Sequence, residues 1–164
     1  MSQPVLTAQD LIAWLEKTST GWRQLLLEHP ELLAMACDIV GVKTVAELLQ
    51  HIVAVELRYA ERLADLPVSD YADIPFDSLE TIYATHNRAM MILQQLLASG
   101  IDWDAPIEHA TRTMGRARSA RKTILFHALL HGIRHYAQLA TLVRQHGIKP
   151  NWAMDYISMD IEFA

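Results

Sequence analysis

Three histidines share one stripe of a predicted helix. His127, His131 and His135 lie four residues apart inside the apolar stretch 124–138. Each four-residue step turns an α-helix by about 40° and advances it by about 6 Å, so neighbouring pairs can bind one ion, whereas the outer two lie about 12 Å apart. With 8 His in 164 residues, chance gives this spacing in about 2% of such chains. The stripe therefore predicts a site for a divalent metal ion.

A fourth histidine can complete such a site. His51 lies on the apolar face of the predicted helix over 44–66. An inward histidine in a bundle is either a hydrogen-bonded core residue or a ligand that faces another helix. With a pair four residues apart, His51 would make a three-His site, which leaves coordination positions open as catalytic zinc sites do. The pattern itself does not choose His127 or His135 as the partner of His131.

Two further groups of residues have both a plain and a functional interpretation. His86 lies on the apolar face of the third predicted helix, where it is either a packed core residue or a residue that lines the site. Basic residues are dense just before the histidine helix, where they form either a solvated helix entry or an anion-binding rim. This basic run consists of Arg112, Arg116, Arg118, Arg121 and Lys122.

Four long amphipathic segments must position the histidines. Their apolar residues follow helical spacing, and capping residues precede them. The capping signals are Thr7 with Asp10, Thr44 with Glu47, and Asp77 with Glu80. We expect long helices over 8–29, 44–66, 77–99 and 119–146, with a short extra helix at 30–37 after the first, because Pro30 suits a first helical position.

The remaining segments are predicted to connect and cover these helices. We expect loops over 67–76 and 101–118, the second anchored on the core by Trp103 and Ile107, and an apolar C-terminal segment, 152–164, packed back on the bundle. The absence of strand-like alternation makes the predicted fold all-α. It is an up-down-type four-helix bundle in a single domain over residues 1–164.

Composition excludes several classes of function. A net charge of −5 argues against a nucleic-acid-binding protein, because such proteins usually present a strongly basic face. Cys37 is the only cysteine, so neither a disulfide framework nor a zinc site of thiolates can form. The sequence carries neither a secretory signal pattern nor an apolar run long enough to span a membrane. We therefore expect a cytoplasmic protein that binds neither nucleic acid nor membranes.

The chain resembles the DinB-like superfamily, which includes the YfiT-type metal-dependent proteins. The resemblance rests on segment 44–59, which contains His51, and on the pattern His127-x3-His131-x3-His135-x2-Gln138. It implies a four-helix bundle that binds one divalent ion through His51, His131 and His135, and leaves His127 as a core residue or a residue beside the ligands. Gln138 would orient a ligand or a bound water, or be a plain surface amide.

One position departs from the commonest motif of that superfamily. Arg134 stands where the motif has an additional histidine before the last ligand. The ligand spacing is unaffected, so the departure concerns only what that histidine would do.

The resemblance also implies a class of function. Characterised members include transferases that use a low-molecular-weight thiol, a mycothiol-dependent isomerase and proteins described as hydrolases, and homodimers are common among them. We therefore expect a metal-dependent thiol S-transferase or hydrolase that acts on a small molecule. Zinc or nickel is the expected ion, and iron also suits imidazole. The alternative is a non-catalytic metal-binding or interaction bundle.

No catalytic residue is assigned by the sequence. Tyr59, Tyr83 and Glu56 are near the predicted site in the pattern only, and Glu56 lies five residues after His51, off its face. A redox di-metal bundle would need Glu-x-x-His pairs, and a metalloprotease would need His-Glu-x-x-His. Neither motif occurs in the chain.

Overall fold

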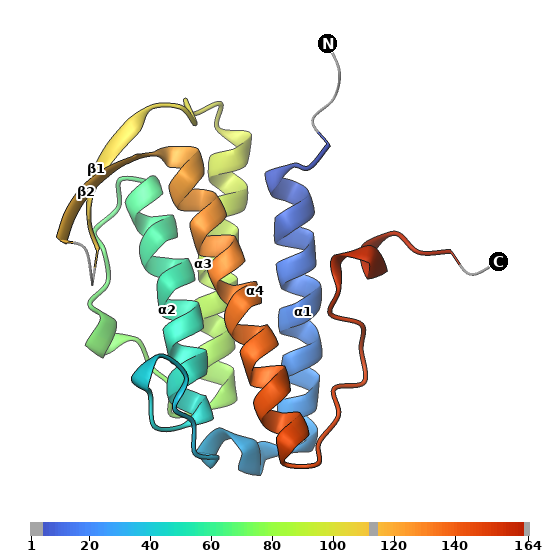
Figure 1. The fold of residues 1–164 in the computed structure, drawn as a ribbon. Helices are drawn as coiled ribbons and strands as arrows, with labels where there is room; N and C mark the ends of the chain where they lie inside the picture. The colour runs from blue at the N-terminus through green and yellow to red at the C-terminus, as the bar shows by residue number, and fades with distance from the viewer. Residues whose placement is uncertain (1–4, 112–114, 163–164) are drawn as a thin grey trace.

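The computed structural model describes residues 5–111 and 115–162. Four long helices lie side by side around a shared apolar core (Figure 1), which confirms the predicted all-α four-helix bundle. They are α1 (Ala8–Glu28), α2 (Val45–Leu63), α3 (Leu79–Ala98) and α4 (Arg121–Gln145). Short 3-10 helices lie at Pro30–Ala34, Ile39–Gly41, Tyr71–Asp73 and Tyr156–Met159. Among the described helices, none has the length of apolar sequence that a membrane crossing needs.

The starts of the first two long helices follow their capping signals. The Thr7 side chain accepts a hydrogen bond from the backbone N–H of Asp10, whose own carboxylate accepts from the Thr7 N–H. Thr44 caps α2 in the same way through the N–H of Glu47. The short helix that Pro30 was expected to open is present as a 3-10 helix. Capping therefore sets these boundaries locally.

The N-cap of helix α3 lies one residue later than the sequence predicts. Its N-cap is Ser78, whose hydroxyl accepts from the N–H of Thr81, so the predicted cap formed by Asp77 and Glu80 is wrong. The Asp77 carboxylate instead accepts a hydrogen bond from the Thr81 hydroxyl. Asp and Ser are equally good N-cap residues, so the residue type does not decide between Asp77 and Ser78. The conformation of the preceding loop decides.

The segment between α2 and α3 crosses the length of the bundle. It retraces α2, because Ser69 donates to the Glu61 carboxylate near the end of α2 and Gln50, near its start, donates to the carbonyl of Ile74. Helices α2 and α3 consequently run in the same direction, and α1 and α4 run in the opposite one (Figure 1). The connectivity is therefore not a simple up-down order but contains one long crossover.

The region expected to be an extended loop before α4 contains a two-stranded antiparallel sheet. Strand β1 (Pro106–Thr111) pairs with β2 (Gly115–Ala120). Exposed and partly buried positions alternate from Pro106 to Ala110 in β1 and from Arg116 to Ser119 in β2, as on a sheet with one covered face. The expectation that strands are absent is thus wrong here, whereas the expected anchors Trp103 and Ile107 do pack against the core.

The C-terminal segment packs back on the bundle through its described residues, as predicted. The indole N–H of Trp14 donates to the carbonyl of Met154. The Trp152 ring covers Gly21 so closely that a Cβ atom at this glycine would lie 2.3 Å from the ring. Gly21 therefore leaves room on α1 for the Trp152 ring, and a larger residue at this position would occupy that room.

Candidate metal centre

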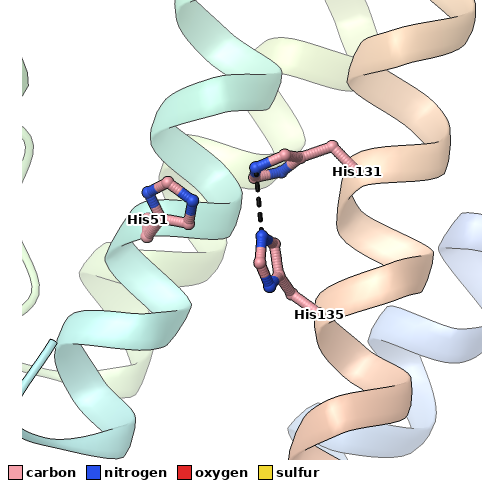
Figure 2. Close-up of side chains that lie close together, drawn as sticks. All are labelled: His51, His131 and His135. Atoms are coloured by element: carbon pink, nitrogen blue, oxygen red, sulfur yellow. Dashed lines mark hydrogen bonds between the residues drawn. The ribbon is translucent and has the colours of Figure 1, made fainter. Parts of the chain in front are cut away.

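Three histidines from two helices meet between α2 and α4. His51 comes from α2, and His131 and His135 come from α4 (Figure 2). The ring centroid of His51 lies 4.8 Å from that of His131 and 5.1 Å from that of His135. One ring nitrogen from each residue lies within 4.8 Å of the others. We call these three residues the histidine cluster.

A glycine allows α4 to approach its neighbours beside the cluster. A Cβ atom on Gly132 would lie 2.9 Å from Leu15 of α1 and 3.2 Å from the Glu56 Oε1 of α2. Contacts this short are rare for a real Cβ, so a larger residue would push the helices apart. Gly132, which directly follows His131, thus helps to bring the histidines of α4 close to His51.

Burial keeps the two α4 histidines of the cluster uncharged. His131 and His135 are 6% and 1% exposed. Burial, together with the positive charges that His135 and His51 would carry, lowers the pKa of His131 to about 2. Burial and the nearby Arg134 lower the pKa of His135, against the opposing effect of Gln138. Both imidazoles are therefore neutral at neutral pH, as metal ligands must be.

Gln138 fixes the orientation of one ring. Its Oε1 lies 2.6 Å from Nδ1 of His135, so an Nδ1–H donates to this amide. The Nε2 of His135 then keeps its lone pair and lies 3.2 Å from Nε2 of His131. Gln138 thus contacts His135 as an orienting group would, rather than being a plain surface amide.

Arg134 lies directly at the cluster. Its Nη2 is 3.2 Å from Nε2 of His135, the nitrogen that the contact with Gln138 leaves free to bind an ion. Arg134 is also one of the charges that lower the pKa of His131 and of His127. A permanent positive charge therefore lies beside the candidate metal position.

His127 lies beside the cluster and not inside it. Its ring centroid is 5.6 Å from that of His131 and 5.4 Å from that of Tyr59, with which it makes an edge-to-face contact. The side chain is exposed, so it is not a core residue. Burial and the charge of Arg134 lower its pKa. The geometry brings His51 together with His131 and His135 and leaves His127 as a neutral neighbour.

His86 is a core residue and lies in a hydrogen-bonded ion pair. Its Nδ1 is 2.7 Å from Oε2 of Glu56, and the two side chains are 6% and 0% exposed. Burial alone would lower the pKa of His86, but the charge of Glu56 and the hydrogen bond to it outweigh burial, so the pKa is raised. We call Glu56 and His86 the core pair. Of the two interpretations of His86, packing in the core is the one that its position supports.

The core pair was not predicted, although the sequence carries a signal for Glu56. Glu56 lies four residues after Ile52 and four before Ala60, both of which are fully buried. A carboxylate inside such an apolar stripe must find a partner. The spacing of Glu56 from His51 places it away from the predicted site, whereas its spacing from Ile52 and Ala60 places it in the core.

The basic run before α4 does not form a rim at the cluster. Within the described part of the run, three side chains have acidic partners, and Arg118 is exposed on β2. The pairs are Arg116 with Glu108, Arg121 with Asp65, and Lys122 with Asp104. Arg112 lies outside the described residues. These contacts favour a solvated helix entry.

A divalent ion fits the chemistry of the cluster. Two imidazole nitrogens bound at about 2.0–2.1 Å to a tetrahedral ion lie about 3.3 Å apart, close to the separation of the His131 and His135 Nε2 atoms. The buried Nδ1 of His131 has no hydrogen-bond partner among the described residues, so the ring could turn either nitrogen to an ion. Within the described chain, the grouped metal-binding side chains are these three histidines, without a carboxylate.

Comparison with known proteins agrees with the fold and with the cluster. Residues 1–162 match the DinB family. No curated protein matches the chain. The family match covers nearly the whole sequence, including both helices that supply the histidines. The chain belongs to the DinB family.

Proposed function

We propose that this protein is a metal-dependent enzyme whose three-His site activates a thiol or water for transfer to, or hydrolysis of, a small molecule. The observation that carries the proposal is the convergence of three buried or half-buried imidazoles from two helices, without a fourth protein ligand among the described residues. Three neutral ligands leave coordination positions open and leave the charge of the ion largely uncompensated. Structural sites are normally closed by four protein ligands.

His51, His131 and His135 are the proposed ligands. When bound there, a divalent ion would lower the pKa of a coordinated thiol or water and so make the nucleophile available at neutral pH. Gln138 would hold the His135 ring with Nε2 toward the ion through the contact already described. His127, exposed and neutral beside the cluster, is placed to accept the proton that such a nucleophile loses.

Zinc and nickel are the ions we favour, with iron as a third choice. All three bind imidazole well, and the metal available in the cell decides among ions of similar affinity. The ligand set is too poor in oxygen atoms for magnesium or calcium, which prefer carboxylates and carbonyls. The donor set therefore selects a transition metal without selecting one element.

One observation favours a second candidate, a metal-binding or interaction bundle without turnover. In the part of the chain that the structure describes, the carboxylate of α2 that extends into the bundle beside Gly132 is Glu56, which is fully buried and binds His86 through Oε2. His127 is then the one base we can name beside the cluster. If His127 does not accept a proton, the site binds a metal but lacks a general base.

Metal content tests the proposal. Untagged protein should contain about one divalent ion per chain by elemental analysis, and His51→Ala should lose it, because removing the α2 ligand leaves a two-histidine site. The loaded protein should then transfer a small thiol to, or hydrolyse, members of a substrate panel. Metal without turnover would favour the non-catalytic bundle, and no metal after incubation with zinc and nickel would refute the site.

A further inference from the structure

Two arginines on the α2 face that carries His51, and a third beside the cluster on α4, lack acidic partners in the described part of the chain. Arg58 and Arg62 lie on α2, seven and eleven residues after His51, and Arg134 lies on α4. Steps of seven and eleven residues return to within about 20° of the same helix face. Among the described residues, none of these three arginines forms a salt bridge, although the protein as a whole is acidic. The positive charge here is local and uncompensated.

The carboxylates of α2 that could neutralise these arginines are engaged elsewhere. Glu56 is fully buried and binds His86. Glu61 is fully buried and accepts hydrogen bonds from Ser69 and Arg88. The Glu56 and Glu61 side chains of α2 are therefore occupied in the core and at the segment between α2 and α3. Arg58 and Arg62 remain on the face of α2 that carries His51.

One arginine of α2 lies against an aromatic ring, and the other has a buried donor that no described residue uses. Arg62 lies over the Tyr59 ring, with its guanidinium carbon 5.1 Å from the ring centroid. Burial and the neighbouring charge of Arg58 lower the pKa of Arg62. The Nε of Arg58 is buried without a hydrogen-bond partner among the described residues. Two guanidinium groups that repel each other, one with an unused buried donor, have the charge and the donors that an oxyanion would satisfy.

Helix direction brings Arg58 and Arg134 toward the same place. Side chains on an α-helix lean toward its N-terminus. Because α2 and α4 are antiparallel (Figure 1), Arg58 leans back toward the turn that carries His51, while Arg134 leans toward His131. Arg134 is already 3.2 Å from the His135 Nε2. The lean of these side chains thus directs both arginines toward the cluster, Arg58 from α2 and Arg134 from α4.

Metal binding would make the position of Arg134 unfavourable unless an anion came with the metal. Its guanidinium donates toward the same nitrogen that the ion would need, and two positive groups at this separation repel each other. An oxyanion between them would satisfy both, since guanidinium groups bind carboxylate and phosphate through two parallel hydrogen bonds. Binding of an oxyanion would explain why an arginine stands at position 134, which the spacing of the metal ligands does not explain.

We propose that Arg58, Arg62 and Arg134 form an anion subsite beside the metal centre, and that the substrate carries a carboxylate or phosphate group that binds there. That the bound anion is the substrate, and not some other ligand, rests on the proposed function. The Tyr59 ring, on which Arg62 lies, contacts the His127 ring, and these two rings would give the substrate an apolar wall. The substrate class is thereby narrowed from a small molecule to a small anion.

Metal-free protein tests the subsite without any assumption about the reaction. Inorganic phosphate and succinate are titrated separately while the Nε–H resonances of the arginines are followed by NMR. Saturable shifts of Arg58 and Arg134 are expected with at least one probe, and the tighter probe identifies the anion. Arg134→Gln should weaken binding about tenfold, since one charge-assisted hydrogen bond contributes roughly that factor. Shifts that do not saturate would overturn the subsite.

Two variants separate a local effect from loss of charge or of folding. Arg144→Gln removes the same charge from an exposed position of α4 about 15 Å further along the helix, and should leave the affinity within about twofold. Arg58→Lys should keep the charge and the fold but lose the paired hydrogen bonds. Equal weakening by Arg144→Gln and Arg134→Gln would mean that the anions respond to net charge, and would also overturn the subsite.

Cobalt-loaded protein links the subsite to the reaction. The visible absorption of the cobalt should respond to 3-mercaptopropionate at about tenfold lower concentration than to 2-mercaptoethanol, because only the first has a carboxylate to bind the arginines. Thiol acidity alone predicts the reverse order. If phosphate or succinate binds but neither thiol changes the spectrum, the subsite stands and thiol activation fails. If both thiols bind equally, the substrate anion does not use the subsite.

Discussion

The histidine cluster and the core pair both contain buried histidines, but the pKa of the histidine is lowered in the cluster and raised in the core pair. His131 and His86 are about equally buried, at 6% and 5% exposure. The pKa of His131 is lowered by burial and by other positive groups, whereas the pKa of His86 is raised because Glu56 outweighs burial. Burial therefore does not decide the charge of a histidine here. The presence of a carboxylate does.

This difference separates a structural histidine from one suited to bind metal. A histidine that shares a proton with a buried carboxylate has its ring nitrogen occupied and is charged when protonated. Histidines grouped without a carboxylate stay neutral and keep lone pairs for an ion. The α2 helix supplies one member to each arrangement, Glu56 and His51, on different faces. One helix thus stabilises the core and contributes to the candidate site.

The largest effect is expected from breaking the core pair. Glu56→Gln keeps the shape of the side chain but removes the charge opposite His86. Removing one partner of a buried ion pair costs about 3–5 kcal/mol, because it leaves the other partner without compensation. Urea denaturation of metal-free protein at pH 6 should show this loss in the free energy of unfolding. The exposed Glu80→Gln is the matched control, with an expected change within about 1 kcal/mol.

The pH dependence of that loss gives an independent check. Because the folded-state pKa of His86 is raised, the stabilisation by the pair is complete below the pKa of an unfolded histidine, about 6.5, and decreases as the pH rises through the folded value. The difference between wild type and Glu56→Gln should therefore shrink above pH 6.5. The lowered pKa values of His131 and His135 act on both proteins alike and cancel. A difference that grows with pH would contradict the pair.

Helical periodicity explains why much of this arrangement could be predicted. The spacing of His127, His131 and His135 on one stripe follows from the helix itself, and the apolar pattern around His51 places it toward a neighbouring helix. The choice of His135 over His127 could not be made in this way, because both lie one turn from His131. That choice depends on the height at which α2 passes α4, which is a property of the packed bundle.

The features that were missed depend on contacts between distant segments. Glu56 and His86 are 30 positions apart and meet only when α2 and α3 pack. The strands β1 and β2 carry small or charged residues such as Ala117, Glu108 and Arg118, which give little β-propensity, so their alternation appears only as partial burial. The local sequence pattern indicates which face of a helix or strand is buried. It does not indicate which residues of other segments pack against that face.

The next largest effect should come from removing the shared member of the cluster. His131→Ala should lose the ion, because only the separated His51 and His135 remain as ligands. At free zinc about 100-fold above the dissociation constant of the wild type, bound metal stabilises the fold by about 2.7 kcal/mol, and this increment should vanish. Thermal or urea unfolding with and without zinc measures it. His127→Ala should keep both the ion and the increment.

These two variants test which pair on α4 binds the ion. Equal loss of metal in His131→Ala and His127→Ala would contradict the assignment of His135 and would place the ion one turn closer to the start of α4. Retention of metal by both variants would show that the three-His site is not the binding site. Both helices remain folded in either case if far-ultraviolet circular dichroism is unchanged.

The smallest of these effects concerns a residue that acts through its neighbour. Gln138→Ala removes the amide that accepts the Nδ1–H of His135, so the ring is freer to turn and to place its proton on Nε2. Loss of such an outer contact usually weakens metal binding about tenfold or somewhat more. Competition with a metal indicator measures the dissociation constant, with the exposed Gln145→Ala on the same helix as control. Gln138→Glu should bind zinc at least as tightly as the wild type, because a carboxylate makes the imidazole a better donor. If Gln138→Ala binds as the wild type does, packing alone orients His135, and the cluster differs from the core pair only in lacking an acid.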